Sequence, residues 1–183
     1  MNEIRRPILL EKLLIALALQ VGSEVSYNEV AQTIGTDNKT VEKYIDLLEK
    51  CYVIFRLNAF NRNLRTELKK SKKIYFYDNG IRNAVIQNFA PLSLRQDTGA
   101  LWENFFISER IKANHYNGNY AKSFFWRTTQ QQEIDYIEEA DGNFTAFEMK
   151  WNPNKRPITF PSPFLNNYPV KETVVITPEN YLE

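Results

Sequence analysis

The sequence predicts a protein of the α+β or α/β class in two parts. Capping residues at Ser26 and Asp37 open two short amphipathic helices early in the chain. Runs rich in aromatic and β-branched residues follow Cys51 and recur in the second half. A hairpin signal, Asp141-Gly142, separates two further strand-like segments. Three helices with a strand pair should therefore precede one long helix and four strands.

The first two predicted helices lie close together. Residues 8–20, within a slightly longer helix that ends at Gly22, have the apolar density of a helix buried on most sides. The next helix opens at the capping box Ser26-Tyr27-Asn28-Glu29 and stops at Gly35. A third helix follows after so short a turn that the three together indicate a helix-turn-helix.

The third predicted helix, capped by Asp37, exposes polar residues at its start, and strands follow it. Residues 52–60 and 72–78 read YVIFRLNAF and KKIYFYD, which predicts two strands joined by a basic wing. Residues 56–73 hold seven basic side chains and one acid. Residues 1–90 are therefore predicted to form a winged helix-turn-helix domain. In such domains the start of the third helix enters the DNA major groove and wing residues hold phosphates. The predicted DNA contacts are Asn38, Lys39, Lys43, Arg62, Arg65, Lys69, Lys70 and Lys72.

An alternative for this domain is contact with protein alone, because Glu42 lowers the positive potential around Lys39 and Lys43. The charge of the whole chain does not decide between the two. The net charge of the chain is +1. Residues 1–96 hold 15 basic and 10 acidic residues, a charge of +5, and residues 97–183 hold 8 basic and 12 acidic residues, a charge of −4. The positive half suits phosphate contacts, whereas the negative half repels DNA unless a cation compensates.

After a short helix over residues 79–88, the Pro-containing segment 91–97 predicts a linker, and residues 98–183 a second domain. Residues 98–115 read TGALWENFFISERIKANH, a helix in which Glu103 sits among apolar side chains. A carboxylate there is costly unless it is paired, protonated or metal-bound. A surface position paired with Arg110 is the alternative. The Pro-rich residues 157–169 predict a loop before a last strand, ETVVIT.

The hairpin around Asp141-Gly142 predicts which acidic residues face each other. Opposed residues have numbers that add up to 283, so Asp135 lies opposite Glu148, and Glu133 opposite Lys150. All four side chains then share one face. Two like charges in this arrangement need a cation, a proton or a lysine between them. A three-residue loop would shift the register and separate them.

Composition excludes several kinds of site. With one cysteine, Cys51, and one histidine, His115, the chain has no internal disulfide and no Cys/His zinc site. Any metal must be held by carboxylates. The longest apolar run near the N-terminus, Leu13 to Leu19, is too short for a membrane span, so we expect a cytoplasmic protein without membrane partners.

A glutamate on a helix, then an aspartate on one strand and Glu-x-Lys on the next, resembles the PD-(D/E)XK nuclease core. The matching residues here are Glu103, Asp135, Glu148 and Lys150. The segments TGALWENFFISERI, FFWRTTQQQEIDYI and FEMKWNPNK, preceded by KKIYFYDNGIRNAV, resemble the C-terminal region of bacterial AAA-type ATPases. That region is known as domain-of-unknown-function family 4143. The resemblance covers nearly the whole chain.

The resemblance implies a restriction-endonuclease-like α/β domain and metal-dependent phosphodiester hydrolysis. Asp135 and Glu148 would bind Mg²⁺ or Mn²⁺, Glu103 would contribute directly or through water, and Lys150 would orient the attacking water. Trp126 and Arg127 would stack on a base and clamp a phosphate, with core packing as the alternative for Trp126.

An alternative is that Lys150 neutralises the carboxylates without metal. Both halves would then form a non-catalytic interaction module that docks on an ATPase domain of the same or another chain. The sequence lacks a G-x-x-x-x-G-K-[ST] phosphate-binding loop, so we expect no nucleotide site and no ATP hydrolysis from these residues.

Overall fold

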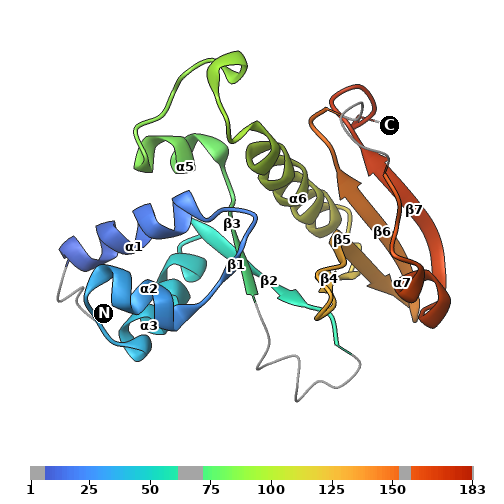
Figure 1. The fold of residues 1–183 in the computed structure, drawn as a ribbon, viewed down its shortest axis with the longest axis horizontal. Coiled ribbons are helices and arrows are strands. Elements are labelled where there is room, and N and C mark those ends of the chain that lie inside the picture. Colours follow the sequence, from blue (N-terminus) through green and yellow to red (C-terminus); the bar gives the residue numbers. More distant parts are fainter. Residues whose placement is uncertain (1–6, 62–71, 153–157, 183) are drawn as a thin grey trace.

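The computed structural model describes residues 7–61, 72–152 and 158–182 of the 183-residue chain. Four of the predicted DNA contacts, Arg62, Arg65, Lys69 and Lys70, lie outside these ranges. The described residues form a mixed α+β structure with six α-helices and one seven-stranded mixed sheet. Figure 1 shows α1, α2 and α3 on one side, the C-terminal strands on the other, and α6 between them.

The second and third of the N-terminal helices begin directly after the predicted capping residues, whereas the first ends at Leu19, before the expected Gly22. The three helices are α1 (Pro7–Leu19), α2 (Tyr27–Ile34) and α3 (Asn38–Lys50). The Ser26 hydroxyl accepts a hydrogen bond from the Glu29 amide at 3.4 Å, and the Asp37 carboxylate accepts one from the Thr40 amide at 2.9 Å. These bonds satisfy amide groups that the first helical turn leaves without partners. Both predicted caps are confirmed.

Helix α1 is less buried than its apolar sequence predicts. Leu13 and Leu17 are fully buried, but Ile8 is 69% exposed, Ile15 37% and Leu19 66%. These three residues are separated by seven and four positions, so they share one face of the helix. The prediction of burial on most sides is wrong for this face, because the core covers only the opposite side.

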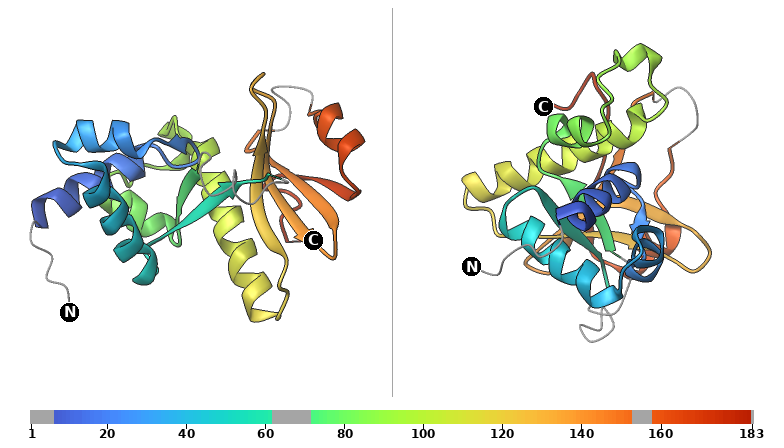
Figure 2. Two further views of the ribbon diagram at one scale, coloured as in Figure 1. Left: turned by 90° about the horizontal axis from the view of Figure 1, so that it is seen from below. Right: turned by 90° about the vertical axis from the view of Figure 1, so that its left-hand side faces the viewer.

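One sheet runs through both predicted domains. Its order is β1-β3-β2-β4-β5-β6-β7. Strand β2 pairs antiparallel with β3 and parallel with β4, with Asn58 opposite Phe124. Figure 2 shows the teal strand β2 running between the N-terminal helices and the C-terminal strands. The boundary at residues 91–97 stays a prediction. The strands are β1 (Glu24–Val25), β2 (Ile54–Ala59), β3 (Lys72–Phe76), β4 (Lys122–Arg127), β5 (Glu133–Ala140), β6 (Asn143–Met149) and β7 (Val170–Ile176).

The β5–β6 hairpin has the predicted register. Tyr136 lies opposite Phe147, and the pairing continues to Ala140 opposite Asn143. Asp141 and Gly142 form the turn with φ values of 51° and 77°. Two successive left-handed residues are what a two-residue turn of type I′ requires, and Asp-Gly suits it. This ladder of paired residues ends at Tyr136, just before Asp135 and Glu133.

The remaining helices pack on this sheet or connect its parts. Helix α6 places Trp102 and Phe106 in the main core with Tyr136 and Phe147. Within the described ranges no helix combines the length and apolar character needed to cross a bilayer. The helices are α5 (Asn79–Val85), the 3-10 helix η1 (Leu92–Leu94), α6 (Thr98–Tyr116) and α7 (Ser162–Asn167).

The predicted C-terminal loop contains helix α7. Pro163 lies in its first turn, where proline costs no hydrogen bond, and Phe164 is fully buried. The ring of Trp126 lies 5.3 Å from that of Phe164 and Trp126 is 7% exposed. The core-packing alternative for Trp126 is therefore confirmed, and stacking on a nucleic-acid base is wrong.

The segment predicted as a linker is held by ion pairs. Asp97 Oδ2 lies 2.5 Å from Arg82 Nη1 and 2.8 Å from Arg95 Nη2. Arg82 Nε also donates to the Ala18 carbonyl at 2.9 Å, and Arg95 Nη1 donates to the Asn88 carbonyl at 2.7 Å. The Arg82–Asp97–Arg95 cluster thus joins α1, α5 and the start of α6.

Candidate carboxylate–lysine site

The structure brings the four predicted catalytic residues into one charged cluster. Glu103 projects from α6, Asp135 from β5 and Glu148 from β6, and Lys150 follows β6 directly. Lys150 Nζ lies 2.7 Å from Glu148 Oε2 and 3.5 Å from Asp135 Oδ2. One lysine therefore serves both strand carboxylates.

Backbone contacts position these side chains. Asp135 Oδ2 accepts a hydrogen bond from the Met149 amide at 3.1 Å. The Lys150 amide donates to the Ile176 carbonyl at 2.9 Å, which continues the pairing of β6 with β7 past the end of β6. Both residues are tied to the sheet, so the lysine reaches the carboxylates from a fixed backbone.

A second lysine, Lys73 on β3, enters the cluster from the N-terminal half. Its side chain is only 3% exposed, and its Nζ lies 2.5 Å from Glu133 Oε1 and 3.3 Å from Glu103 Oε1. The Tyr75 hydroxyl also donates to Glu103 Oε1 at 2.5 Å. Gly22, with a φ of 78°, borders the Glu103 carboxylate, since a Cβ there would lie 3.4 Å from Oε2.

One predicted pairing and one alternative pairing are wrong. Glu133 contacts Lys73 and Arg127, and its partner is not Lys150. Arg110 pairs with Glu138 at 2.8 Å and does not serve Glu103. Both errors have one cause. Lys73, which contacts Glu103 and Glu133, lies on a strand of the other predicted domain, 30 residues before Glu103 in the sequence.

Lys73 and Tyr75 are the contributors that the sequence analysis missed. The alternation of side chains along KKIYFYD does place Lys73 and Tyr75 on one face of a strand. This alternation does not indicate that the face of the strand contacts Glu103. Only the pairing order of the sheet supplies that information.

Burial raises the pKa of both glutamates. The pKa of Glu103 rises to about 7, chiefly because the carboxyl is desolvated and Asp135 adds negative charge, while Lys73 opposes the rise. The pKa of Glu148 also rises to about 7 through burial and the charge of Asp135, opposed by Lys150. Burial alone would lower the pKa of Lys73, but Glu103 and Glu133 outweigh it and raise that pKa.

The donor atoms suit a hard cation by their chemistry, since Mg²⁺ and Mn²⁺ prefer carboxylate oxygen. The placement of these carboxylates does not suit a metal ion. Among the described residues no three Asp, Glu, His or Cys side chains are placed to hold a metal ion. Lys150 takes the position between Asp135 and Glu148 that a cation would need, and Lys73 takes the corresponding place beside Glu103. As arranged, each of the two lysines contacts two carboxylates.

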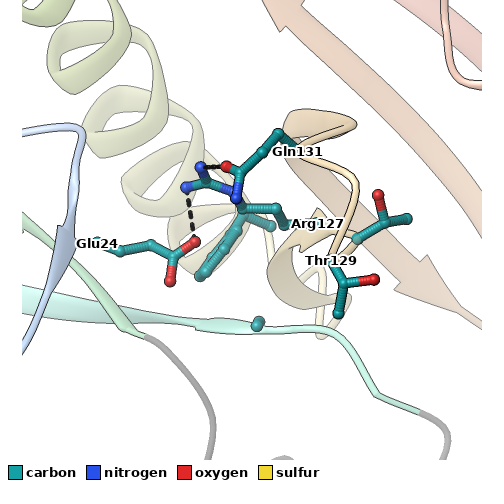
Figure 3. A pocket seen from close by; sticks show the side chains of 7 residues that line it. Glu24, Arg127, Thr129 and Gln131 are labelled. Carbon is teal, nitrogen blue, oxygen red and sulfur yellow. Dashed lines mark hydrogen bonds and ion pairs between the residues drawn. The ribbon is translucent and has the colours of Figure 1, made fainter.

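Arg127, the predicted phosphate clamp, borders this cluster. Figure 3 shows its guanidinium between Glu24 and Gln131 at a pocket of about 400 Å³. Arg127 Nη1 lies 2.7 Å from Glu24 Oε1 and 3.5 Å from Glu133 Oε2, and Nη2 donates to Gln131. Arg127 thereby connects β1 of the N-terminal half to the acidic strand β5.

The other described DNA candidates lie on the N-terminal half. Asn38, Lys39 and Lys43 are exposed along the start of α3. Lys72 is half-buried, and its Nζ lies 5.4 Å from the centre of the Tyr27 ring on α2. Lys72 directly precedes Lys73 in β3, so the two predicted functional regions adjoin along this strand.

Comparison with known proteins identifies relatives of unknown function. The chain is 29% identical over 136 residues to uncharacterized proteins of Mycobacterium bovis and Mycobacterium tuberculosis, covering 73% of this chain and 30% of each relative. It is also 29% identical over 83 residues to an uncharacterized protein of Haemophilus influenzae, covering 43% of this chain and 21% of the relative. The chain thus spans less than a third of the length of these relatives. No solved structure matches it.

Two family models match successive parts of the chain. Residues 98–181 match the Domain of unknown function (DUF4143), which confirms the resemblance to that family for the C-terminal part. Residues 1–92, half of the 183 residues, match the Domain of unknown function (DUF8612). The chain therefore belongs to the DUF8612 family, and its C-terminal part is similar to the DUF4143 family.

Proposed function

We propose that this chain is the C-terminal module of an AAA-type ATPase-family protein. In this module a winged helix, residues 1–90, binds DNA, and a PD-(D/E)XK-like domain carries a nuclease-like site whose charges are held by lysine. The order of Glu103, Asp135, Glu148 and Lys150 along α6, β5 and β6 supports the nuclease-like relationship. The greater length of the relatives is consistent with an ATPase domain beside this module.

The exposed start of α3 is the observation that carries the DNA contact. Lys39 and Lys43 lie one helical turn apart, both are exposed, and Asn38 precedes them at the N-terminus of the helix. Val41, Tyr44 and Ile45 bury the opposite face, so α3 is fixed on the core while its basic side faces outward. This is the arrangement that a helix entering a major groove requires.

Replacing both Lys39 and Lys43 by Ala should weaken binding to duplex DNA and flatten its salt dependence. Each phosphate contact contributes roughly 0.9 to the slope of log affinity against log salt, so the slope should decrease by about 2. Fluorescence anisotropy titrations at several salt concentrations measure the affinity and this slope. Lys171→Ala, an exposed lysine on β7, is the matched control and should change neither quantity. Equal slopes for the wild type and the double variant would refute contact through α3.

The carboxylate–lysine site is expected to exclude metal in the wild type. Calorimetry with Mn²⁺ and Mg²⁺ should show no binding at low millimolar concentration, because the Lys150 ammonium already occupies the place between Asp135 and Glu148. The Lys150→Met variant should gain Mn²⁺ binding, since it leaves the two carboxylates without a cation. Adding Asp135→Asn should abolish that gain.

Metal binding by the wild type would have the opposite meaning. If it were lost in a variant combining Asp135→Asn with Glu148→Gln, the site would be a divalent-cation site. Nuclease assays on single- and double-stranded DNA would then decide whether it hydrolyses phosphodiesters. The lysine-held site would be refuted by that result.

A non-catalytic docking module is the second candidate, and the exposed face of α1 favours it. Ile8, Ile15 and Leu19 present apolar side chains along one side of that helix. An ATPase domain that covers this face would bury them. Association with such a domain should persist at high salt, because apolar contacts do not release counterions, whereas DNA binding should weaken steeply.

A further inference from the structure

A second pocket, of about 510 Å³, lies where the end of α3 meets the end of α6. It shares no lining residue with the carboxylate–lysine site or with the Arg127 pocket. Ligand sites commonly have volumes of roughly 300–1,000 Å³ and are lined by aromatic side chains with a few polar groups. The tyrosine cleft, as we call it, is lined by Tyr52, Tyr77, Asp78, Lys112, His115 and Tyr116.

Tyr52 occupies a backbone conformation that tyrosine rarely adopts. It follows the last turn of α3 with a φ of 56°, in the left-handed region where helices usually place glycine. Its ring is not stabilised by burial, because the residue is 73% exposed. The ring centre lies 5.8 Å from that of Tyr77 at an angle of 57°. A strained backbone that holds an aromatic ring at the mouth of a pocket points to a role for the ring itself.

The other wall of the cleft comes from the end of α6. Tyr116 is 80% exposed, and His115 lies beside it with ring centres 6.3 Å apart. Lys112 Nζ donates to the Tyr77 carbonyl at 3.2 Å, which fixes α6 against the end of β3. Aromatic rings from two elements thus flank one opening, with one ammonium and the Asp78 carboxylate among them. This composition suits a planar ring that stacks and also carries polar edges.

A basic face of α3 leads to the tyrosine cleft. Lys39, Lys43 and Lys50 are all exposed, and their spacing of four and seven residues places them on one side of the helix. At 1.5 Å per residue they extend over about 16 Å. Arg56 offsets part of the acidic charge near this face, since its Nη2 lies 2.8 Å from Asp46 Oδ1 and also contacts Glu49. Exposed lysines therefore recur along this side of α3 up to Tyr52, with the exposed Glu42 as an acidic neighbour of Lys39 and Lys43.

We infer that the tyrosine cleft binds an unpaired nucleobase of a single-stranded DNA segment whose phosphates follow the lysine face of α3. Stacking of bases on aromatic rings beside a positive track is how single strands are held without sequence readout. A proline-rich peptide also fits aromatic clefts, but it offers no anions to Lys39, Lys43 and Lys50. The inference rests on the proposed DNA contact through α3 and names its substrate class.

The Tyr52→Gly variant separates binding from folding. Glycine adopts the left-handed region freely, so the variant should fold with a melting temperature no lower than that of the wild type. Its affinity for a labelled oligothymidylate should decrease about tenfold, the effect of losing one stacked base. Its affinity for a duplex of equal length should stay the same. Tyr116→Ala should behave alike, whereas Tyr120→Ala, which removes a 93% exposed tyrosine outside the cleft, should bind as the wild type does.

The outcomes are distinguishable. If single-strand affinity is the same in Tyr52→Gly, Tyr116→Ala and the wild type, while Lys39→Ala with Lys43→Ala lowers it, the cleft does not hold a base and the proposed DNA contact stands. If the wild type binds neither kind of DNA, the proposed function and this inference both fail. A third outcome is that Tyr52→Gly weakens binding of a polyproline peptide but leaves DNA binding unchanged. The cleft would then be a peptide site, and the inference would be overturned.

Discussion

Replacing Asp97 by Asn is expected to lower the free energy of unfolding by about 3 kcal/mol, the lower end of the cost of removing one partner from a buried ion pair. The Arg82 and Arg95 side chains are only 4% and 2% exposed, and Asp97 is the carboxylate that both contact. Its removal leaves two guanidinium groups in a poorly solvated place. Urea denaturation at pH 7 measures the change. The lower end applies because the Asp97 side chain is 27% exposed.

The effect of Asp97→Asn should depend on pH with a definite sign. Hydrogen bonds from Arg95, and from Arg82, hold the pKa of Asp97 well below its ordinary value of 3.8. A carboxyl with a lowered pKa stabilises the fold above that ordinary value, and the contribution is lost as the pH falls further. The difference in the free energy of unfolding between the variant and the wild type should thus be largest at pH 7 and should decrease below about pH 4. Asp141→Asn, in the exposed hairpin turn, is the matched control and should be nearly neutral because Asn-Gly also suits that turn. A variant as stable as the wild type at pH 7 would show that the cluster does not hold the two halves together.

Replacing Lys73 by Met should destabilise the protein by about 3–5 kcal/mol at pH 8. Methionine retains the length of the side chain but removes the ammonium that lies between Glu103 and Glu133. With Asp135 nearby, the buried carboxylates would repel one another without compensation. Denaturant titrations at pH 5 and pH 8 measure the loss.

The same titrations test the electrostatic origin of the effect. The pKa of Glu103 is raised to about 7 by burial, so its protonated form is favoured in the folded state. Such a group stabilises the fold fully below its ordinary pKa of 4.5, and the contribution is lost as the pH rises through about 7. Without Lys73 the pKa of Glu103 rises further, and the deficit should be smaller at pH 5 than at pH 8. Lys72→Met, one residue earlier on β3, is the control and should cost little at either pH. A deficit of equal size at both pH values would indicate lost packing and no charge effect.

Local features of the sequence predicted local features of the structure. Ser26 and Asp37 cap helices as expected, because capping needs only a side-chain oxygen and an amide three residues away. Asp141-Gly142 set the hairpin register, because few residue pairs adopt two successive left-handed conformations. Glu103, marked as costly among apolar neighbours, is indeed held by a lysine and a tyrosine.

The partners of those charges required the tertiary structure. Lys73 reaches Glu103 and Glu133 only because β3 lies in the same sheet as the C-terminal strands, joined through the parallel pairing of β2 with β4. The tyrosine cleft likewise exists only because Tyr52, at the end of α3, and Tyr116, at the end of α6, line one pocket. By itself the sequence determined the starts of α2 and α3 and the turn of the β5–β6 hairpin, since these depend on neighbours a few residues away. The folded structure decided which lysine contacts which carboxylate. That choice depends on contacts between segments far apart in the sequence, and the sequence does not show which of these segments lie close together in space.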